Sequence, residues 1–309
     1  MKYLVTGAAG FIGSHVSKRL LDDGHSVTTI DNLSTGFKNQ IPDGCEFIHG
    51  DLSEDSTIDK IEKKFFDAIL HFAGQSSGEI SAEDPIADLN SNVVSTIKLL
   101  EYARKTGCKR FIYASSMSIY GELPGKECFA ETDIADPKIF YSVGKLASEN
   151  YLKVYSRQYG IVFTALRYFN IYGEGQNMNN LKQGMVSIYL KQFLDNKFEN
   201  VEIKGDIQRF RDLSHISDIV DVTVESINNS DFFNEIINIG SGVKITVEEI
   251  IFQIREILDS KKSIVISKGT PGDQFGIFAN VTKLQNIYEK KFLKFNKGLQ
   301  RTIDSLCKD

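Results

Sequence analysis

The sequence predicts an α/β fold in which a doubly wound parallel sheet is followed by a smaller α/β domain. Three observations carry this prediction. Short apolar runs alternate with helical patterns through the first half, a glycine-rich turn joins the first run to the first helix, and the chain has 309 residues, more than one typical domain. Alternating strands and helices make a parallel sheet that is covered on both faces. We expect domains over 1–170 and 171–309, with a strand near 235–240 returning to the first.

The expected elements follow from the periodicity of apolar residues. Helical spacing follows the first apolar run and recurs over two longer stretches, at about 85–106 and 246–258. Ligands of doubly wound sheets gather at the carboxyl ends of the strands, so polar residues at these ends are the functional candidates. Buried strands are expected at 3–6, 26–30, 46–49, 67–72, 109–115 and 161–166.

A glycine turn follows the first expected strand, in the segment Gly7-Ala-Ala-Gly10-Phe-Ile-Gly13. Gly7 would allow the tight turn, Gly10 the close approach of a pyrophosphate, and Gly13 the close packing of helix on sheet. The N-terminus of the next helix would offer its N–H groups to the phosphates. Asp31, at the end of the second strand, can accept both adenosine ribose hydroxyls and would repel a 2′-phosphate. The pattern therefore predicts NAD rather than NADP; a purely structural turn and a capping aspartate are the alternatives.

A Tyr-x-x-x-Lys pair, Tyr141 and Lys145, lies downstream of Ser115 and Ser116, which end the fifth expected strand. Residues four apart on a helix share a face, so the phenol and the ammonium would point into the same space. An unperturbed tyrosine titrates near ~10. A nearby ammonium and the positive ring of an oxidised nicotinamide would both lower that pKa. The pair, with the Ser116 hydroxyl, predicts proton abstraction from a sugar hydroxyl.

Composition excludes several classes of protein. The net charge of -5 is spread over interspersed signs, which argues against a nucleic-acid surface. No run of about 18 apolar residues predicts a membrane helix, and the N-terminus lacks a signal-peptide pattern. The four cysteines have no metal-ligand spacing, so we expect reduced thiols, no metal site and a cytoplasmic protein. His71 and His215 lack a nucleophile pattern nearby and are expected to be structural.

Six motifs in this order resemble the extended short-chain dehydrogenase/reductase family, and within it the NAD-dependent nucleotide-sugar epimerases and dehydratases, closest to the UDP-hexose 4-epimerases. They are the glycine turn, Asp31-Asn32-Leu33, Asp51-Leu52, His71-Phe72-Ala73-Gly74, Ser115-Ser116 with Tyr120-Gly121, and Tyr141-x-x-x-Lys145. The match runs to about Gly240. The resemblance implies a Rossmann-type first domain and tightly bound NAD. It implies that NAD is held by Gly7, Gly10, Phe11, Ile12, Gly13, Asp31, Asn32, Asp51, Leu52, Phe72, Ala73, Gly74, Asn92, Ser115, Tyr141, Lys145 and Phe169.

The resemblance also implies a second domain that binds a nucleotide sugar. Arg211-Asp212 matches the family's Arg-Asp pair, in which the arginine grips the diphosphate through its planar fork. Thr270 stands where relatives usually carry another arginine, and Arg209 is expected to compensate, with a surface ion pair as the alternative. The expected substrate-binding residues are Ser116, Ser118, Asn170, Arg209 and Arg211.

The resemblance implies an isomerase in which Ser116, Tyr141 and Lys145 are catalytic. The segment Ser116-Met117-Ser118 carries neither the acidic pair of dehydratases nor the cysteine of 3,5-epimerases. We therefore expect a 4-epimerase of carbohydrate metabolism or polysaccharide biosynthesis that acts on a UDP-hexose, in its plain, N-acetyl or uronic acid form, through a transient 4-keto sugar. The alternatives are a C4 dehydrogenase or reductase and a non-catalytic nucleotide-binding protein. A homodimer is expected through helices near 91–104 and 141–159.

Overall fold

The computed structural model describes residues 1–309 apart from 62, 124, 181–183, 270–274 and 308–309. It divides into two compact units. The first comprises Met1–Gly121, Asp133–Tyr168 and Ile219–Asn238, and the second comprises Glu122–Thr132, Phe169–Asp218 and Ile239–Asp309. The chain therefore passes between the two units several times along its length.

The first unit is built on a seven-stranded sheet with the order β11-β7-β5-β4-β1-β2-β3. The strands from β3 across to β7 pair in parallel, as expected. The predicted strands are confirmed, with ends that move by at most two residues. Their bounds are β1 Lys2–Thr6, β2 Ser26–Asp31, β3 Glu46–His49, β4 Ala68–His71, β5 Arg110–Ser116, β7 Val162–Tyr168 and β11 Glu235–Ile239.

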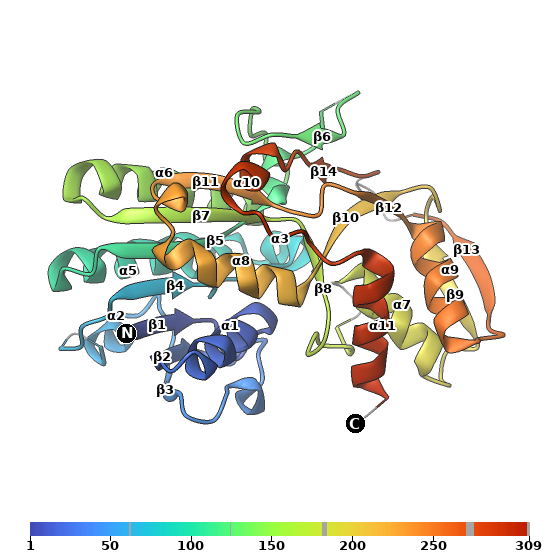
Figure 1. Cartoon of the computed structure of the whole chain (residues 1–309), viewed down its shortest axis with the longest axis horizontal. Coiled ribbons are helices and arrows are strands. Elements are labelled where there is room, and N and C mark those ends of the chain that lie inside the picture. Colours follow the sequence, from blue (N-terminus) through green and yellow to red (C-terminus); the bar gives the residue numbers. More distant parts are fainter. Residues whose placement is uncertain (62, 124, 181–183, 270–274, 308–309) are drawn as a thin grey trace. The chain divides into compact units, whose positions relative to one another are not determined.

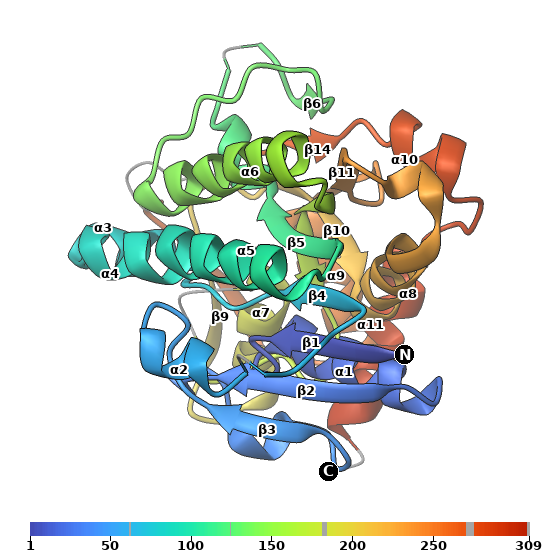
Figure 2. The same cartoon turned by 90° about the vertical axis from the view of Figure 1, so that its left-hand side faces the viewer.

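Helices cover both faces of this sheet. The chain moves one way from β1 to β2 and the other way from β4 to β5, so right-handed crossovers put the connecting helices on opposite faces. Figures 1 and 2 show α1 and α8 over one face and α5 and α6 over the other. The doubly wound prediction is therefore confirmed. The helices are α1 Phe11–Asp22, α2 Asp55–Asp59, α3 Gly78–Glu83, α4 Pro85–Leu89, α5 Ser95–Thr106, α6 Phe140–Tyr159 and α8 Ile216–Asn228, with 3₁₀ turns at Lys38–Gln40, Met117–Tyr120 and Ser230–Phe232.

The long helical pattern expected over 85–106 is confirmed, but it contains a π-helical turn, Asn90–Val94, between α4 and α5. The backbone carbonyl of Asn92 accepts hydrogen bonds from the hydroxyls of Thr96 at 2.7 Å and Ser148 at 2.9 Å. A π turn inserts one extra residue and is common at functional sites. Here it fixes the direction of the Asn92 side chain.

The strands read as continuous apolar runs because they are buried on both faces. Leu4, Ile69 and Phe111, on three neighbouring strands, are fully buried in one hydrophobic cluster. Burial of each such side chain stabilises the fold by about 1.5–3 kcal/mol. The core thereby holds the carboxyl ends of the strands, where the candidate residues lie, in fixed register.

The second unit is smaller and has three short sheets, in agreement with the predicted α/β fold. They are β12-β10-β8 (Lys244–Thr246, Phe210–His215, Asn170–Tyr172), β13-β9 (Ser263–Ser267, Asn200–Lys204) and β14-β6 (Phe278–Ala279, Cys128–Phe129). The helix expected over 246–258 is α9, Val247–Leu258, which Thr246 and Glu249 begin with a reciprocal capping box. The other helices are α7 Met185–Leu194, α10 Thr282–Ile287 and α11 Phe295–Leu306.

Candidate active site

The glycine turn after β1 admits no side chain at two positions. Gly7 has a φ of 70°, and a Cβ there would lie 2.6 Å from the Ala73 nitrogen. A Cβ on Gly13 would lie 2.2 Å from the Gly7 carbonyl oxygen, so α1 packs directly against the turn. Helix α1 begins without a side-chain cap at Gly10 and has no acidic residue in its first turn. Its N-terminal N–H groups therefore suit an anionic pyrophosphate.

Two carboxylates stand at the ends of neighbouring strands beside this turn. Asp31 closes the turn, because its carboxylate accepts from the Ala9 N–H at 3.0 Å and the Leu33 N–H at 2.8 Å. Asp51 accepts from the Asn32 amide at 2.9 Å and from the Ser53 N–H at 2.8 Å. Carboxylates fixed in this way can accept hydroxyl or amine donors of an adenosine. The residues present therefore fit the dinucleotide that the glycine turn predicts.

The structure brings together Ser116, Tyr141 and Lys145. Ser116 ends β5, and its Oγ accepts from the Ser118 N–H at 3.2 Å and Oγ at 3.0 Å. On α6, the Lys145 Nζ lies 5.7 Å from the Tyr141 ring centre and donates to the Ala114 carbonyl at 2.9 Å. The helical spacing thus does place the phenol and the ammonium on one face of α6.

Burial and neighbouring groups shift the pKa values of both Tyr141 and Lys145. For Tyr141 the direction is opposite to the one expected from the sequence. Burial raises the pKa of Tyr141 to about 12; the Ser116 hydrogen bond lowers it, and the Asp88 charge raises it. Burial lowers the pKa of Lys145 to about 8 against the opposing charges of Asp88 and Glu149. The predicted lowering of the tyrosine pKa therefore requires the positive nicotinamide in addition to Lys145.

Asn92 carries a buried acceptor next to this group. Its Nδ2 donates to the Gln75 carbonyl at 3.0 Å and to Asp88 Oδ1 at 3.1 Å. Its Oδ1 is buried and has no hydrogen-bond partner among the described residues. A Cβ on Gly74 would lie 2.5 Å from that oxygen and 3.5 Å from the Lys145 Nζ. An unsatisfied buried acceptor of this kind fits a hydroxyl donor of a bound ribose.

A buried ion pair behind the catalytic group was not predicted from the sequence. Glu149 accepts from Arg167 through both carboxylate oxygens, at 2.9 and 2.7 Å, and from the Ser115 hydroxyl at 2.5 Å. Arg167 also donates to the Tyr120 hydroxyl at 2.8 Å. Glu149 follows Lys145 by four residues on α6, so helical spacing was the signal that it shares this face.

His71 is a structural histidine, as expected. It is fully buried between the hydroxyls of Thr6, at 2.7 Å, and Thr96, at 3.1 Å. Burial, together with the charge of Lys145, lowers its pKa to about 3. The ring is therefore neutral at physiological pH and supplies no charge to the site.

In the second unit, the expected substrate residues make backbone contacts. The Asn170 amide donates to the Asp212 carbonyl at 3.2 Å, and Arg211 donates to the Phe210 carbonyl at 2.7 Å. Arg209 is 7% exposed, and its guanidinium donates to the carbonyls of Asp206 and Lys204. Arg209 is thus buried, and these two hydrogen bonds hold its own turn together. Thr270 lies outside the described residues.

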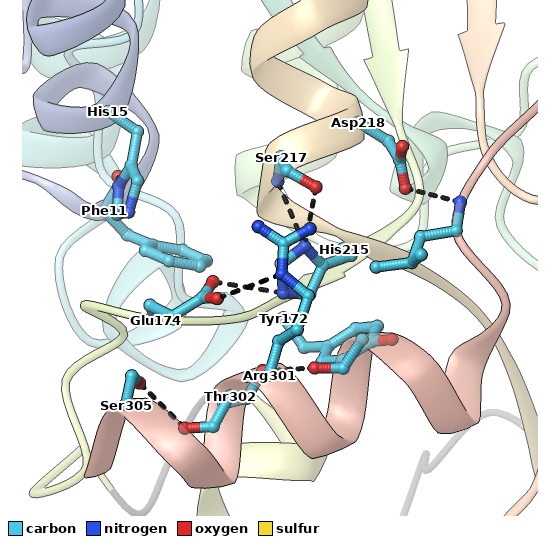
Figure 3. A network of polar contacts seen from close by, with 12 residues as sticks. Phe11, His15, Tyr172, Glu174, His215, Ser217, Asp218, Arg301, Thr302 and Ser305 are labelled. Carbon is cyan, nitrogen blue, oxygen red and sulfur yellow. Dashed lines mark hydrogen bonds and ion pairs between the residues drawn. The ribbon is translucent and has the colours of Figure 1, made fainter. Parts of the chain in front are cut away.

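A second buried polar group in this unit is shown in Figure 3. His215 contacts Ser217 Oγ at 2.9 Å through Nδ1 and Glu174 Oε2 at 3.1 Å through Nε2. The histidine lowers the pKa of Glu174 to about 2, and burial opposes that shift. These contacts join the turn after β8 to the end of β10, so His215 is structural, as predicted.

Two further findings concern the described residues as a whole. None of their helices is both long and apolar enough to cross a membrane. They also contain no cluster of three or more His, Cys, Asp or Glu side chains able to hold a metal ion.

Comparison with known proteins agrees with this geometry. The UDP-glucose 4-epimerase of Thermotoga maritima, solved with UDP-glucose, is 31% identical, with a TM-score of 0.94 over 100% of this chain and 99% of that one. The Thermus thermophilus UDP-glucose 4-epimerase, solved with NAD, is 31% identical, with a TM-score of 0.91 over 99% of each chain. A UDP-N-acetylglucosamine 4-epimerase of Methanobrevibacter ruminantium is 29% identical, with a TM-score of 0.92 over 99% and 98%.

The model of the NAD dependent epimerase/dehydratase family matches residues 3–240, a span that includes the glycine turn, Ser116, Tyr141 and Lys145. This is more than half of the chain. The protein therefore belongs to the NAD dependent epimerase/dehydratase family.

Proposed function

We propose that this enzyme is a nucleotide-sugar 4-epimerase that acts on a UDP-hexose with tightly bound NAD. The observation that carries the proposal is the grouping of Ser116, Tyr141 and Lys145 beside Gly74 and the free acceptor of Asn92. The likeness to two UDP-glucose 4-epimerases and one UDP-N-acetylglucosamine 4-epimerase supports the reaction and the nucleotide.

In the proposed reaction, Tyr141 takes the proton from the sugar 4-hydroxyl and later returns it. Ser116 holds that oxygen by a hydrogen bond while the C4–O single bond becomes a carbonyl and then a single bond again. Lys145 favours the phenolate by its positive charge. Bound NAD supplies the acceptance and return of hydride at C4. The residues expected to hold NAD, apart from Phe169, lie in the first unit, and Arg211, in the second unit, would bind the diphosphate of the nucleotide sugar.

The reaction class follows from what the serine segment lacks. Met117 and Ser118, which follow Ser116, offer no carboxylate for elimination of water and no thiol for a second proton transfer. The serine segment therefore offers no group that would remove a proton from C3 or C5 of a substrate oxidised at C4. Return of the hydride to the other face of C4 is the step that remains.

The test is a substrate panel on the purified enzyme without added cofactor. The panel contains UDP-glucose, UDP-galactose, their N-acetyl and uronic acid counterparts, a GDP-sugar and a dTDP-sugar. NMR reports the C4 stereochemistry of the product, and absorbance reports NADH. We expect C4 interconversion of one UDP-sugar pair without net NADH. Stoichiometric NADH that needs added NAD to continue would instead establish a dehydrogenase.

Asp31→Ala should weaken NAD binding by at least about tenfold, since a charged acceptor is lost, and should relax the preference for NAD over NADP. Titration calorimetry with both cofactors, on enzyme stripped of bound cofactor, measures the two affinities. Asp22→Ala, at the exposed end of α1, is the control. If neither affinity changed, Asp31 would have no part in cofactor choice.

We also propose a homodimer. The sequence predicted its contact on helices near 91–104 and 141–159, which are α5 and α6, whereas the exposed apolar residues lie on α6 and α4, so we place the contact on these two helices instead. Phe140, Val143, Tyr151 and Val154 lie on one side of α6 at helical spacing and are 41–53% exposed. Ile86 and Leu89 extend this apolar face onto α4, at 66% and 46% exposure. An exposed apolar face of this kind marks an interaction site, and a second copy of the same face is complementary in character.

The cytoplasmic location and a part in polysaccharide biosynthesis remain predictions from the sequence.

The double variant Tyr151→Glu/Val154→Glu should convert the dimer to a monomer, because it places charge at the centre of the contact. Light scattering on a sizing column gives the mass. Phe252→Glu, which changes an exposed residue of α9, should leave the mass unchanged. A wild-type protein that elutes as a monomer would refute the proposed contact.

A further inference from the structure

A buried carboxylate lies beside the catalytic pair, and neither the sequence motifs nor the proposed reaction uses it. Asp88, on α4, is 2% exposed. Its Oδ1 accepts a hydrogen bond from the Asn92 amide, one helical turn later, at 3.1 Å. Carboxylates are almost never fully buried without a compensating partner. The position of Asp88 therefore calls for a physical explanation.

Gly144 permits the close approach of α4 to α6 at this point. It lies between Tyr141 and Lys145 on α6, and a Cβ there would lie 3.2 Å from the Asn92 Cβ and 3.5 Å from Asp88 Oδ2. A Cβ would be in ordinary contact with the carboxylate but would crowd the Asn92 side chain. The glycine thus brings Asp88 against the stretch of α6 that carries both titrating groups.

The charges around Lys145 single out Asp88. Lys145 is 5% exposed, and its ammonium donates a hydrogen bond to the uncharged carbonyl of Ala114. Glu149 also acts on it, but both oxygens of that carboxylate are held by the Arg167 fork. Glu149 and Arg167 compensate each other, which leaves Asp88 to balance the buried ammonium.

We propose that Asp88 is a positioning residue of the reaction: its buried carboxylate fixes the Asn92 amide and is the counter-charge of Lys145 across the Gly144 contact. The proposal rests on the proposed function, because it assumes that Tyr141 and Lys145 carry the chemistry. By the same charge, Asp88 adds to the effect of burial in opposing ionisation of Tyr141.

The sign of the effect on pH dependence follows directly. Removal of a negative charge makes an ammonium less stable and a phenolate more stable, so both pKa values fall. The acidic limb of the rate profile, set by Tyr141, and the basic limb, set by Lys145, should therefore both move to lower pH. The other titratable groups around the pair are the neutral His71, Tyr113, the compensated Glu149 and the exposed Glu79 and Glu83 of α3.

The experiment compares Asp88→Asn with Asp84→Asn, in the enzyme with its copurified cofactor. Asp84 is the exposed N-cap of α4, and asparagine keeps that cap while removing the same charge. Lysine labelled with ¹³C at Cε reports the ionisation of Lys145 by NMR, with the resonance assigned by its loss in Lys145→Arg. The pH profile of turnover is recorded beside it.

In Asp88→Asn we expect the midpoint of the Lys145 titration to fall by roughly one pH unit. Both limbs of the pH profile of turnover should shift to lower pH by the same amount. In Asp84→Asn neither should move. An unchanged Lys145 midpoint in Asp88→Asn would overturn the proposal, since a merely structural carboxylate lowers stability without moving that midpoint. If Asp88→Asn fails to fold, Asp88→Ser removes the charge instead, and the charge-conserving Asp88→Glu is its control.

The two proposals can fail separately. If Tyr141→Phe keeps full activity, the proposed reaction is wrong, whereas the NMR midpoint still tests Asp88. If Tyr141→Phe is inactive and the Lys145 midpoint is the same with and without Asp88, the reaction stands and the counter-charge is refuted.

Discussion

Tyr141→Phe should lower turnover by roughly a thousandfold or more, which is the range for loss of a positioned proton-transfer group. Phenylalanine keeps the ring and its packing but has no proton to exchange with the sugar 4-hydroxyl. Bound cofactor should remain, because the glycine turn, Asp31 and Asn92 are unchanged. Turnover is measured with the UDP-sugar pair that the wild type interconverts, and cofactor content by its release on denaturation.

The control for this substitution is Tyr159→Phe, on the same helix and 41% exposed, which should turn over like the wild type. Residual activity of more than a few per cent in Tyr141→Phe would remove the tyrosine as the base. Loss of bound cofactor together with activity would show instead that the hydroxyl is needed for binding, and the kinetic loss would then say nothing of proton transfer.

Glu149→Gln should be the most destabilising of these substitutions, with a loss of about 3 kcal/mol in the free energy of unfolding. It leaves the Arg167 guanidinium, 5% exposed in its side chain, buried without its counter-charge. The Ser115 hydroxyl also loses its charged acceptor. Urea denaturation followed by circular dichroism measures the change.

Two further variants make that measurement decisive. Asp22→Asn breaks the exposed Lys18–Asp22 pair on α1 and should change stability by less than about 1 kcal/mol. The double variant Glu149→Gln/Arg167→Met removes both partners and should recover part of the loss, since no unpaired charge then stays buried. A single variant as stable as the wild type would mean that the pair contributes little to the fold.

The features that the sequence determined are local ones. The strands were found because residues buried on both faces of a parallel sheet form continuous apolar runs. Gly7 and Gly13 were found because a tight strand-to-helix turn leaves no room for a Cβ. Tyr141 and Lys145 were placed together because four residues make about one helical turn. In each case the spacing of the residues along the chain determines how they lie in space.

Other features were decided only by the tertiary structure. Asp88 lies beside Gly144 and the Asn92 amide because α4 packs against α6, and Asn92 lies in a π-helical turn between α4 and α5. The pKa of Tyr141 rises rather than falls because burial, which no spacing records, outweighs its hydrogen bond. The desolvation of a titratable group and the charges that act on it depend on all the residues around it. These surroundings form only when distant segments of the chain pack together, so the sequence of a single segment does not predict them.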